Sequence, residues 1–257
     1  MNAYVLSHGL DGERQRLALM SELLDPTERA HIQRLGLQPG WHCLEVGSGN
    51  GSIAQWLASQ VCPTGHVVAS DLETSYIASL QAPCLEVRQL DILQGPVEQA
   101  HFDLVVTRAV LHHLADPRQA LQNMMKALKP GGVLLVTEPD MLPATAAEPE
   151  SMRKFWEGWF RWAEASGIDY FVGGKIAPLM DSLGLQDVSA EGRTVQFNGG
   201  SPWAVYCMET MRELRSKLSE TGHISDELFA EFYSHFEDQH YWTSVINFVA
   251  ASGRKPA

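Results

Sequence analysis

The stretch Leu44-Glu45-Val46-Gly47-Ser48-Gly49-Asn50-Gly51-Ser52-Ile53-Ala54 is the part of this 257-residue chain that decides its fold. Apolar residues lead into it, as in a buried parallel strand, and apolar residues after it recur at the spacing of one helix face. Its three glycines stand at alternate positions, where the backbone can turn sharply and a ligand can approach without meeting a Cβ atom. The stretch therefore predicts a strand, a tight turn and a helix whose N-terminus helps to bind a nucleotide-type cofactor.

The spacing of these glycines separates two classes of cofactor. A dinucleotide-binding loop follows the pattern G-x-G-x-x-G/A, but here the frame from Gly47 has Ser52 in the third position and a glycine one residue early, at Gly51. The acidic Glu45 would repel a pyrophosphate and favours a cationic ligand. An NAD-dependent oxidoreductase is therefore disfavoured, and a glycine-rich turn without any ligand is the simplest alternative.

The chain as far as residue 140 alternates apolar strands with helices. Strands are expected at 41–46, 66–71, 84–87, 102–107 and 133–138, and helices at 52–60, 73–80 and 117–128. Such alternation predicts an α/β fold with a parallel sheet and right-handed crossovers.

About residues 40–140 resemble the class I S-adenosyl-L-methionine (SAM) dependent methyltransferases. The resemblance consists of the pattern acid-x-Gly-x-Gly-x-Gly followed by four further motifs in the order that the family has them. The resemblance implies a doubly wound, mostly parallel seven-stranded Rossmann-like sheet with helical lid insertions. It also implies SAM as the cofactor and S-adenosyl-L-homocysteine as its product. The residues that it assigns to the cofactor are Glu45, Gly47, Ser48, Gly49, Gly51, Asp71, Leu72, Asp91, Ile92, Thr107 and Arg108.

Two aspartates at strand ends carry the more specific cofactor predictions. Asp71 ends the second strand, where doubly wound folds bind ribose hydroxyls; its alternative role is to cap the helix expected at 73–80. Asp91 follows the third strand and resembles the family residue that accepts a hydrogen bond from the adenine amino group, with the N–H of Ile92 serving a ring nitrogen. A surface turn is the alternative for Asp91.

Two adjacent histidines, His112 and His113, follow the fourth strand. In the family this strand end lies beside the departing methyl group, and a histidine there can act as a general base near neutral pH. We expect His113, or else His112, to deprotonate a hydroxyl or phenol acceptor, whereas an amine needs a base less. The alternative is that one histidine packs in the core and the other binds backbone. The histidines are too close to each other in sequence, and have too little carboxylate company, to predict a metal site.

Composition limits the partners and the compartment. The chain has 19 Lys and Arg against 31 Asp and Glu, a net charge of −12 without a basic cluster, which disfavours nucleic acid as a partner. Its four cysteines form no C-x-x-C pair and are expected to be free thiols in a reducing compartment. No leader sequence and no apolar run of membrane-spanning length is recognised. We therefore expect a cytoplasmic protein without membrane contacts, either a monomer or a homodimer.

Helical segments are expected at three places outside the alternating pattern. Residues 1–36 are predicted to form an N-terminal helical lid with a break at Asp25-Pro26, and the methyltransferase domain, 37–257, to carry insertions at about 141–172 and 200–240. An aromatic stripe at 152–163 either lines an acceptor pocket or belongs to the core. The last strand is expected at 243–250, followed by a frayed tail. A lid over the site favours a small-molecule acceptor.

The resemblance implies methyl transfer to a small molecule at oxygen or nitrogen. No Asn/Asp-Pro-Pro-Tyr/Phe sequence follows the fourth strand, which disfavours the amino-methylases of adenine and glutamine. No cysteine closely follows that strand, which disfavours attack on cytosine C5 through a thiolate adduct. Two alternatives stay open: a carbon methyltransferase of a quinone or polyketide-type ring, and a SAM-binding protein that transfers no methyl group.

Overall fold

The computed structural model describes residues 12–95 and 97–257, so the part of the predicted lid before residue 12 lies outside the described residues. The first five strands are β1 (His42–Val46), β2 (His66–Asp71), β3 (Leu85–Gln89), β4 (Phe102–Arg108) and β5 (Leu128–Asp140), and they run parallel. Two further strands, β9 (Asn247–Arg254) and β6 (Gln186–Thr194), complete the sheet in the order β3-β2-β1-β4-β5-β9-β6. Since β9 is antiparallel to both neighbours, the predicted mostly parallel seven-stranded sheet is confirmed.

Helices cover both faces of this sheet because its central strands are apolar on both sides. On one face, α2 (Ser52–Val61) packs with Ile32 of α1 (Glu13–Arg34). The other face is covered by α3 (Pro117–Ala127) and α5 (Gly173–Ser182). Asp116 begins α3 as predicted, since its side chain accepts a hydrogen bond from the N–H of Gln119.

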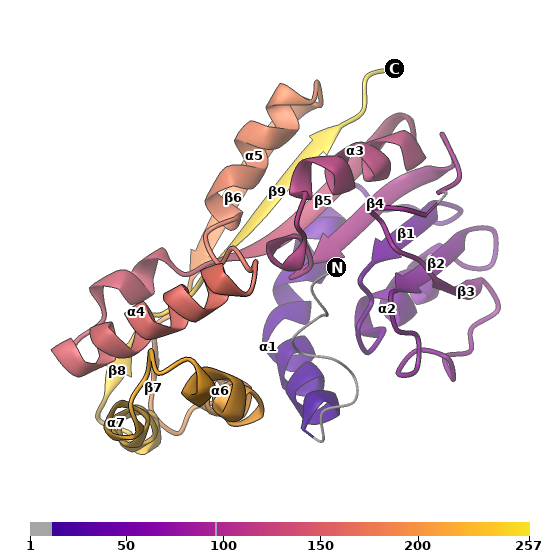
Figure 1. Cartoon of the computed structure of the whole chain (residues 1–257). Coiled ribbons are helices and arrows are strands. Elements are labelled where there is room, and N and C mark those ends of the chain that lie inside the picture. Colours follow the sequence, from indigo (N-terminus) through magenta and orange to yellow (C-terminus); the bar gives the residue numbers. More distant parts are fainter. Residues whose placement is uncertain (1–11, 96) are drawn as a thin grey trace.

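A second cluster of helices lies at the end of the sheet where β5 ends (Figure 1). It consists of α4 (Glu150–Ala165), α6 (Pro202–Glu220) and α7 (Asp226–Glu237). These helices have an aromatic core of their own, with Phe155 stacked on Phe232. Two 3-10 turns, Leu111–His113 and Leu142–Ala146, and a two-stranded sheet of β7 (Phe197–Asn198) and β8 (Trp242–Thr243) complete the described elements.

Three local predictions are wrong. The first helix does not break at Pro26, because packing on both sides of the proline holds one continuous helix, α1. The tail does not fray at Gly253 and Arg254, which pair with β5. Residues 73–80 form turns in place of a helix.

The cysteines also differ from the expectation of four free thiols. Cys62, at the end of α2, and Cys84, just before β3, form a disulfide with their Cα atoms 6.0 Å apart. Cys43 and Cys207 are free and buried. The pairing could not be seen in the sequence because the two cysteines are 22 residues apart and are brought together only by the crossover. Cys62 and Cys84 therefore do not support the expectation of a reducing compartment. No described helix is both long enough and apolar enough to cross a membrane.

Reduction of this disulfide should destabilise the protein, because the crosslink restricts the unfolded chain. We expect the free energy of unfolding, measured by urea denaturation with and without dithiothreitol, to fall by about 2 to 4 kcal/mol on reduction. The Cys62→Ser/Cys84→Ser double variant is the control and should not respond to dithiothreitol. Four reactive thiols in the denatured, unreduced wild type would contradict the pairing.

Candidate functional site

A cavity of about 340 Å³ opens at the carboxyl ends of the central strands. The loops after β1, β2, β3 and β4 form one side of it, and residues of α1, α4 and α6 form the other. The carboxyl edge of an open α/β sheet is where ligands bind in doubly wound folds. Nine of the thirteen residues predicted from the sequence line this cavity: Gly47, Gly49, Asp71, Leu72, Asp91, Ile92, Arg108, His112 and His113.

The glycine loop forms the floor of the cavity next to β1. Gly47 and Gly49 have φ angles of +73° and +55°, which side chains other than glycine rarely adopt. A Cβ atom on Gly47 would also lie 2.2 Å from Cγ2 of Val110, so this position has no room for a side chain. Gly51 lies at the start of α2 beneath Leu80, outside the cavity wall.

The two predicted aspartates lie beside this loop. The Oδ2 atom of Asp71 accepts a hydrogen bond of 2.9 Å from the N–H of Gly49, which ties the end of β2 to the glycine loop. The Oδ1 atom of Asp91 accepts one of 2.9 Å from the N–H of Leu93. Because no helix follows Asp71, its alternative role as a helix cap is not available. Both carboxylates keep lone pairs for further donors.

Three more of the predicted residues lie beneath the cavity wall. Glu45 is buried, and burial raises its pKa to about 8 against the opposing effect of Arg108. Ser48 is buried in the glycine loop, and Thr107 donates a hydrogen bond of 2.9 Å to the carbonyl of Val46. These residues lie beneath the strand ends that border the cavity.

Arg108 connects the cavity to the N-terminal helix. Its Nη2 atom is 2.9 Å from Oδ1 of Asp25, and both side chains are about nine-tenths buried. The same oxygen of Asp25 accepts a hydrogen bond from Ser52 at the start of α2. The sequence showed Asp25 only as a predicted helix break, and its role here depends on a contact 83 residues along the chain.

The two histidines lie side by side after β4, with ring centroids 3.8 Å apart. The Nδ1 atom of His112 is 2.8 Å from Oε2 of Glu138 at the end of β5, so the expectation that no carboxylate accompanies the histidines is wrong for His112. Burial, together with the charge of Arg16, lowers the pKa of His112 to about 3, and Asp169 opposes this effect. Burial and the neighbouring His112 also lower the pKa of His113 well below its usual value.

Glu138 was missed by sequence reasoning, although it ends the apolar strand predicted at 133–138. Its carboxylate is completely buried and accepts backbone hydrogen bonds from Val110, Leu111 and His112. Burial raises the pKa of Glu138 to about 7, and the three N–H groups oppose that effect. One carboxylate thus holds the whole turn that presents the histidines.

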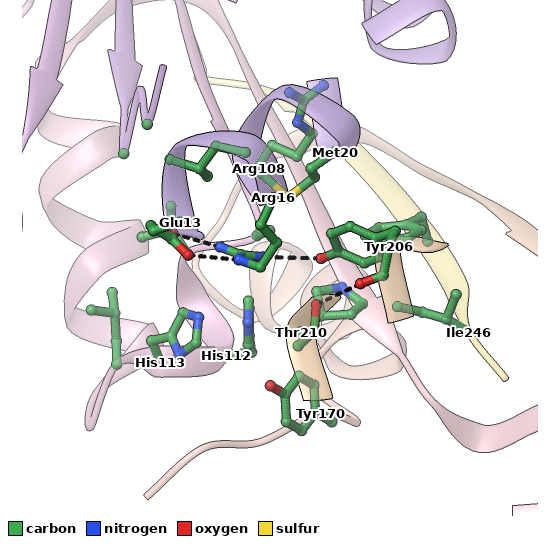
Figure 2. Close-up of a pocket in the computed structure, with 18 of the residues that line it drawn as sticks. Glu13, Arg16, Met20, Arg108, His112, His113, Tyr170, Tyr206, Thr210 and Ile246 are labelled. Atoms are coloured by element: carbon green, nitrogen blue, oxygen red, sulfur yellow. Dashed lines mark hydrogen bonds and ion pairs between the residues drawn. The ribbon is translucent and has the colours of Figure 1, made fainter. Parts of the chain in front are cut away.

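A buried ion pair covers the opposite side of the cavity. Arg16 of α1 contacts both carboxylate oxygens of Glu13 at 2.7 Å, and its Nη1 atom donates to the hydroxyl of Tyr206 of α6 at 3.2 Å. Figure 2 shows this group facing His112 and His113 across the cavity. No sequence signal pointed to Glu13 or Arg16 as site residues. They are three residues apart on α1, and their place beside the cavity depends on the packing of α1 against α6, where Arg16 meets Tyr206.

Aromatic and aliphatic side chains form the rest of the wall. Trp156 and Trp159 of α4 line the cavity and also belong to the aromatic core, so the stripe at 152–163 is both core and cavity wall. Tyr170, Met141 and Phe248 continue this apolar surface. Among residues 12–95 and 97–257, no three His, Cys, Asp or Glu side chains are arranged to hold a metal ion.

Comparisons with known proteins agree with this geometry. Residues 44–136 match a family model described as a methyltransferase domain. The chain is 33% identical over 119 residues to the ubiquinone/menaquinone biosynthesis C-methyltransferase UbiE of Ectopseudomonas mendocina, covering 43% of this chain and 46% of that protein. It is 23% identical over 237 residues to phosphoethanolamine N-methyltransferase 1 of Triticum aestivum, covering 89% of this chain and 43% of that protein. The chain thus spans less than half the length of these curated relatives.

A solved structure shares the fold. Haemonchus contortus phosphoethanolamine N-methyltransferase 2, in complex with phosphomonomethylethanolamine and S-adenosylhomocysteine, superposes with a TM-score of 0.59 at 19% sequence identity, covering 98% of this chain and 56% of that one. The match of residues 44–136 to a methyltransferase domain, the strand order of the sheet and the glycine loop at its carboxyl edge agree with the expected resemblance to class I SAM-dependent methyltransferases.

Proposed function

We propose that the protein transfers the methyl group of SAM to a hydroxyl of a small, largely apolar acceptor. The observation that carries this proposal is His112, which is hydrogen-bonded to Glu138 and lines the cavity on the turn after β4. The cavity has a polar half, formed by the glycine loop with Asp71 and Asp91, and an aromatic half that includes Tyr170, whose ring lies 5.3 Å from that of His112. The polar half suits the cofactor and the aromatic half suits the acceptor.

The polar half fits SAM by charge and by shape. Glycines at positions 47 and 49 leave the floor free of side chains, and the Asp71 carboxylate is oriented by the loop itself. A carboxylate in that position accepts hydrogen bonds from a ribose diol, and Asp91 with the N–H of Ile92 can serve the adenine edge. We infer that Leu72 covers the adenosine. When bound, SAM supplies an electrophilic methyl group.

The aromatic half favours a neutral acceptor. Of the described residues that line the cavity, the arginines are Arg16 and Arg108, and each is paired with a buried carboxylate, Glu13 or Asp25. A phosphorylated acceptor would need cations whose charge is still available. Trp156 and Trp159 instead offer flat apolar walls, which suit a phenol or another ring compound.

The reaction then needs alignment and one proton acceptor. The acceptor O–H donates to Nε2 of His112, which makes no hydrogen bond to the described residues. As the new O–C bond forms and the C–S bond breaks, the electron pair of the C–S bond stays on sulfur and the proton moves to Nε2, from which it later passes to solvent. We assign the base to His112, with His113 as its neighbour.

The helices around the cavity exclude water from this step. We propose that α1 is the described part of an N-terminal lid, because its first turn places the Glu13 and Arg16 pair inside the cavity. The insertions at about 141–172 and 200–240 contain α4, α6 and α7, of which α4 and α6 complete the acceptor side.

Carbon methylation of a quinone-type ring is the second candidate. The likeness to UbiE and the aromatic wall both favour it. In that reaction His112 would remove a proton from a phenol and so activate the ring carbon, and the same residues would bind the cofactor.

Ligand titration and labelling test the proposed function. In calorimetry, SAM and S-adenosylhomocysteine should bind and NAD should not. A metabolite extract incubated with the protein and methyl-deuterated SAM should yield a labelled product whose mass spectrum locates the methyl group on oxygen, nitrogen or carbon. Binding of NAD in place of SAM would overturn the proposal, and SAM binding without any labelled product would indicate a protein that transfers no methyl group.

Asp71→Ala should weaken SAM binding by about 1 to 3 kcal/mol, because the ribose hydroxyls and the N–H of Gly49 lose their acceptor. Calorimetry measures the change. Asp116→Ala is the matched control: it removes the cap of α3, away from the cavity, and should lower stability by about 1 kcal/mol without changing SAM affinity. Equal SAM affinity in the Asp71→Ala variant and the wild type would exclude Asp71 from the site.

His112→Ala should lower kcat by about 100-fold or more on a hydroxyl acceptor while SAM affinity is kept. His66→Ala, at the start of β2, is the control and should keep the rate. In the wild type, kcat should fall as the pH is lowered through about 7, where the His112 and Glu138 pair takes up a proton and Nε2 is no longer free to accept one. Among the described residues, the other charged or titratable groups that interact with the pair include Arg16, Asp169 and His113 near His112, and Glu28 near Glu138. A rate that is unchanged in His112→Ala would remove this residue from the mechanism.

A further inference from the structure

The two oxygens of Glu138 have different partners. Oε1 accepts the N–H of Val110 at 2.8 Å and the N–H of Leu111 at 2.7 Å. Oε2 faces the side chain of His112, with Nδ1 at 2.8 Å, and lies 3.3 Å from the backbone N–H of the same residue. The carboxylate therefore meets three backbone donors and one imidazole nitrogen, and it is completely buried.

These contacts determine which nitrogen of His112 carries the proton. A carboxylate has only acceptor atoms, so the neutral imidazole must donate from Nδ1, and Nε2 is then left with its lone pair. Three backbone N–H groups around one carboxylate favour its ionised form, which requires this tautomer.

We propose that Glu138 is a positioning residue that holds His112 in the Nδ1–H tautomer and thereby makes Nε2 the proton acceptor for methyl transfer. The catalytic part of this inference rests on the proposed function, whereas the tautomer follows from the contacts alone. Glu138 touches neither the cofactor nor the acceptor, since it does not line the cavity, and it acts only through His112.

The structure makes Glu138→Gln a sharp test. The carbonyl oxygen of the new amide has to take the place of Oε1, because two strong backbone donors point there. The amide NH₂ group must then take the place of Oε2 and donate to Nδ1 of His112. His112 would switch to the Nε2–H tautomer, and the cavity would lose its proton acceptor while the shape of the site stays almost the same.

The experiment combines a spectroscopic readout with kinetics. Protein with ¹⁵N-labelled histidine is studied by long-range ¹H–¹⁵N correlation at about pH 8.5, above the pKa of about 7 of Glu138. The signals of His112 are assigned by comparison with His112→Ala among the ten histidines of the chain. Wild-type His112 should be protonated at Nδ1, and Glu138→Gln should move the proton to Nε2.

In the same variant, kcat on the acceptor identified by deuterium labelling should fall by about 10² to 10⁴-fold, with SAM affinity unchanged. Glu86→Gln is the matched control, because Glu86 contacts His66 at 3.3 Å on β2 and β3, away from the cavity. It should change neither the tautomer of His112 nor kcat.

The outcomes distinguish the tautomer of His112 from its role as the proton acceptor. An Nε2–H tautomer in the wild type would overturn the role of Glu138 without any variant and without any assay of activity. A switch of tautomer with an unchanged kcat would overturn the proton-acceptor role of His112. A loss of activity without a switch would show that Glu138 has only a structural role, and thermal denaturation of Glu138→Gln would reveal such a loss of structure directly.

Discussion

The register of the parallel strands is the constraint on which the site depends. Val46 of β1 lies opposite Ser70 of β2 and Thr107 of β4, and Thr107 lies opposite Val136 of β5. One residue further along each strand, Gly47, Asp71 and Arg108 therefore stand at the same level of the sheet edge. Residues that are distant in sequence meet there because each strand ends at about the same height.

This register also explains how a carboxylate from β5 reaches the turn after β4. Arg108 pairs with Thr137 in the register, so Glu138 is the first residue of β5 beyond the last residue of β4. Its side chain lies beneath the turn and accepts hydrogen bonds from three backbone N–H groups. These groups follow the end of β4, where the sheet no longer provides them with partners. A shift of the register by one residue would turn Glu138 to the opposite face and leave those donors unpaired.

Buried charge is concentrated around the cavity and is closely balanced. Arg16 neutralises the charge of Glu13, and Arg108 neutralises that of Asp25. Both arginines line the cavity. Glu45 has no such partner of its own, and burial raises its pKa for that reason. Breaking a buried pair costs much more than forming it gains, so Asp25 with Arg108 holds α1 against the end of β4. The hydrogen bond from Arg16 to Tyr206 joins α1 to α6.

The sequence by itself determined the alternation of strands and helices, the glycine loop and the acids at the strand ends. These features are local: a glycine with a left-handed backbone, as at Gly47, or an aspartate directly after an apolar strand, as at Asp71, carries its meaning within a few residues. Together with the family resemblance that they carry, they were sufficient to predict the seven-stranded sheet. Nine of the thirteen predicted site residues line the cavity.

The tertiary structure alone decided the contacts between distant segments. Four pairs are of this kind: Glu138 with His112, Arg108 with Asp25, Arg16 with Tyr206, and Cys62 with Cys84. The local sequence does not show which residue is the partner in such a pair, even where it singles out one member, because the partner is supplied by the packing of another element. The path of α1 through Pro26 was misjudged for the same reason, since the packing of a long helix outweighs the one backbone hydrogen bond that a proline removes.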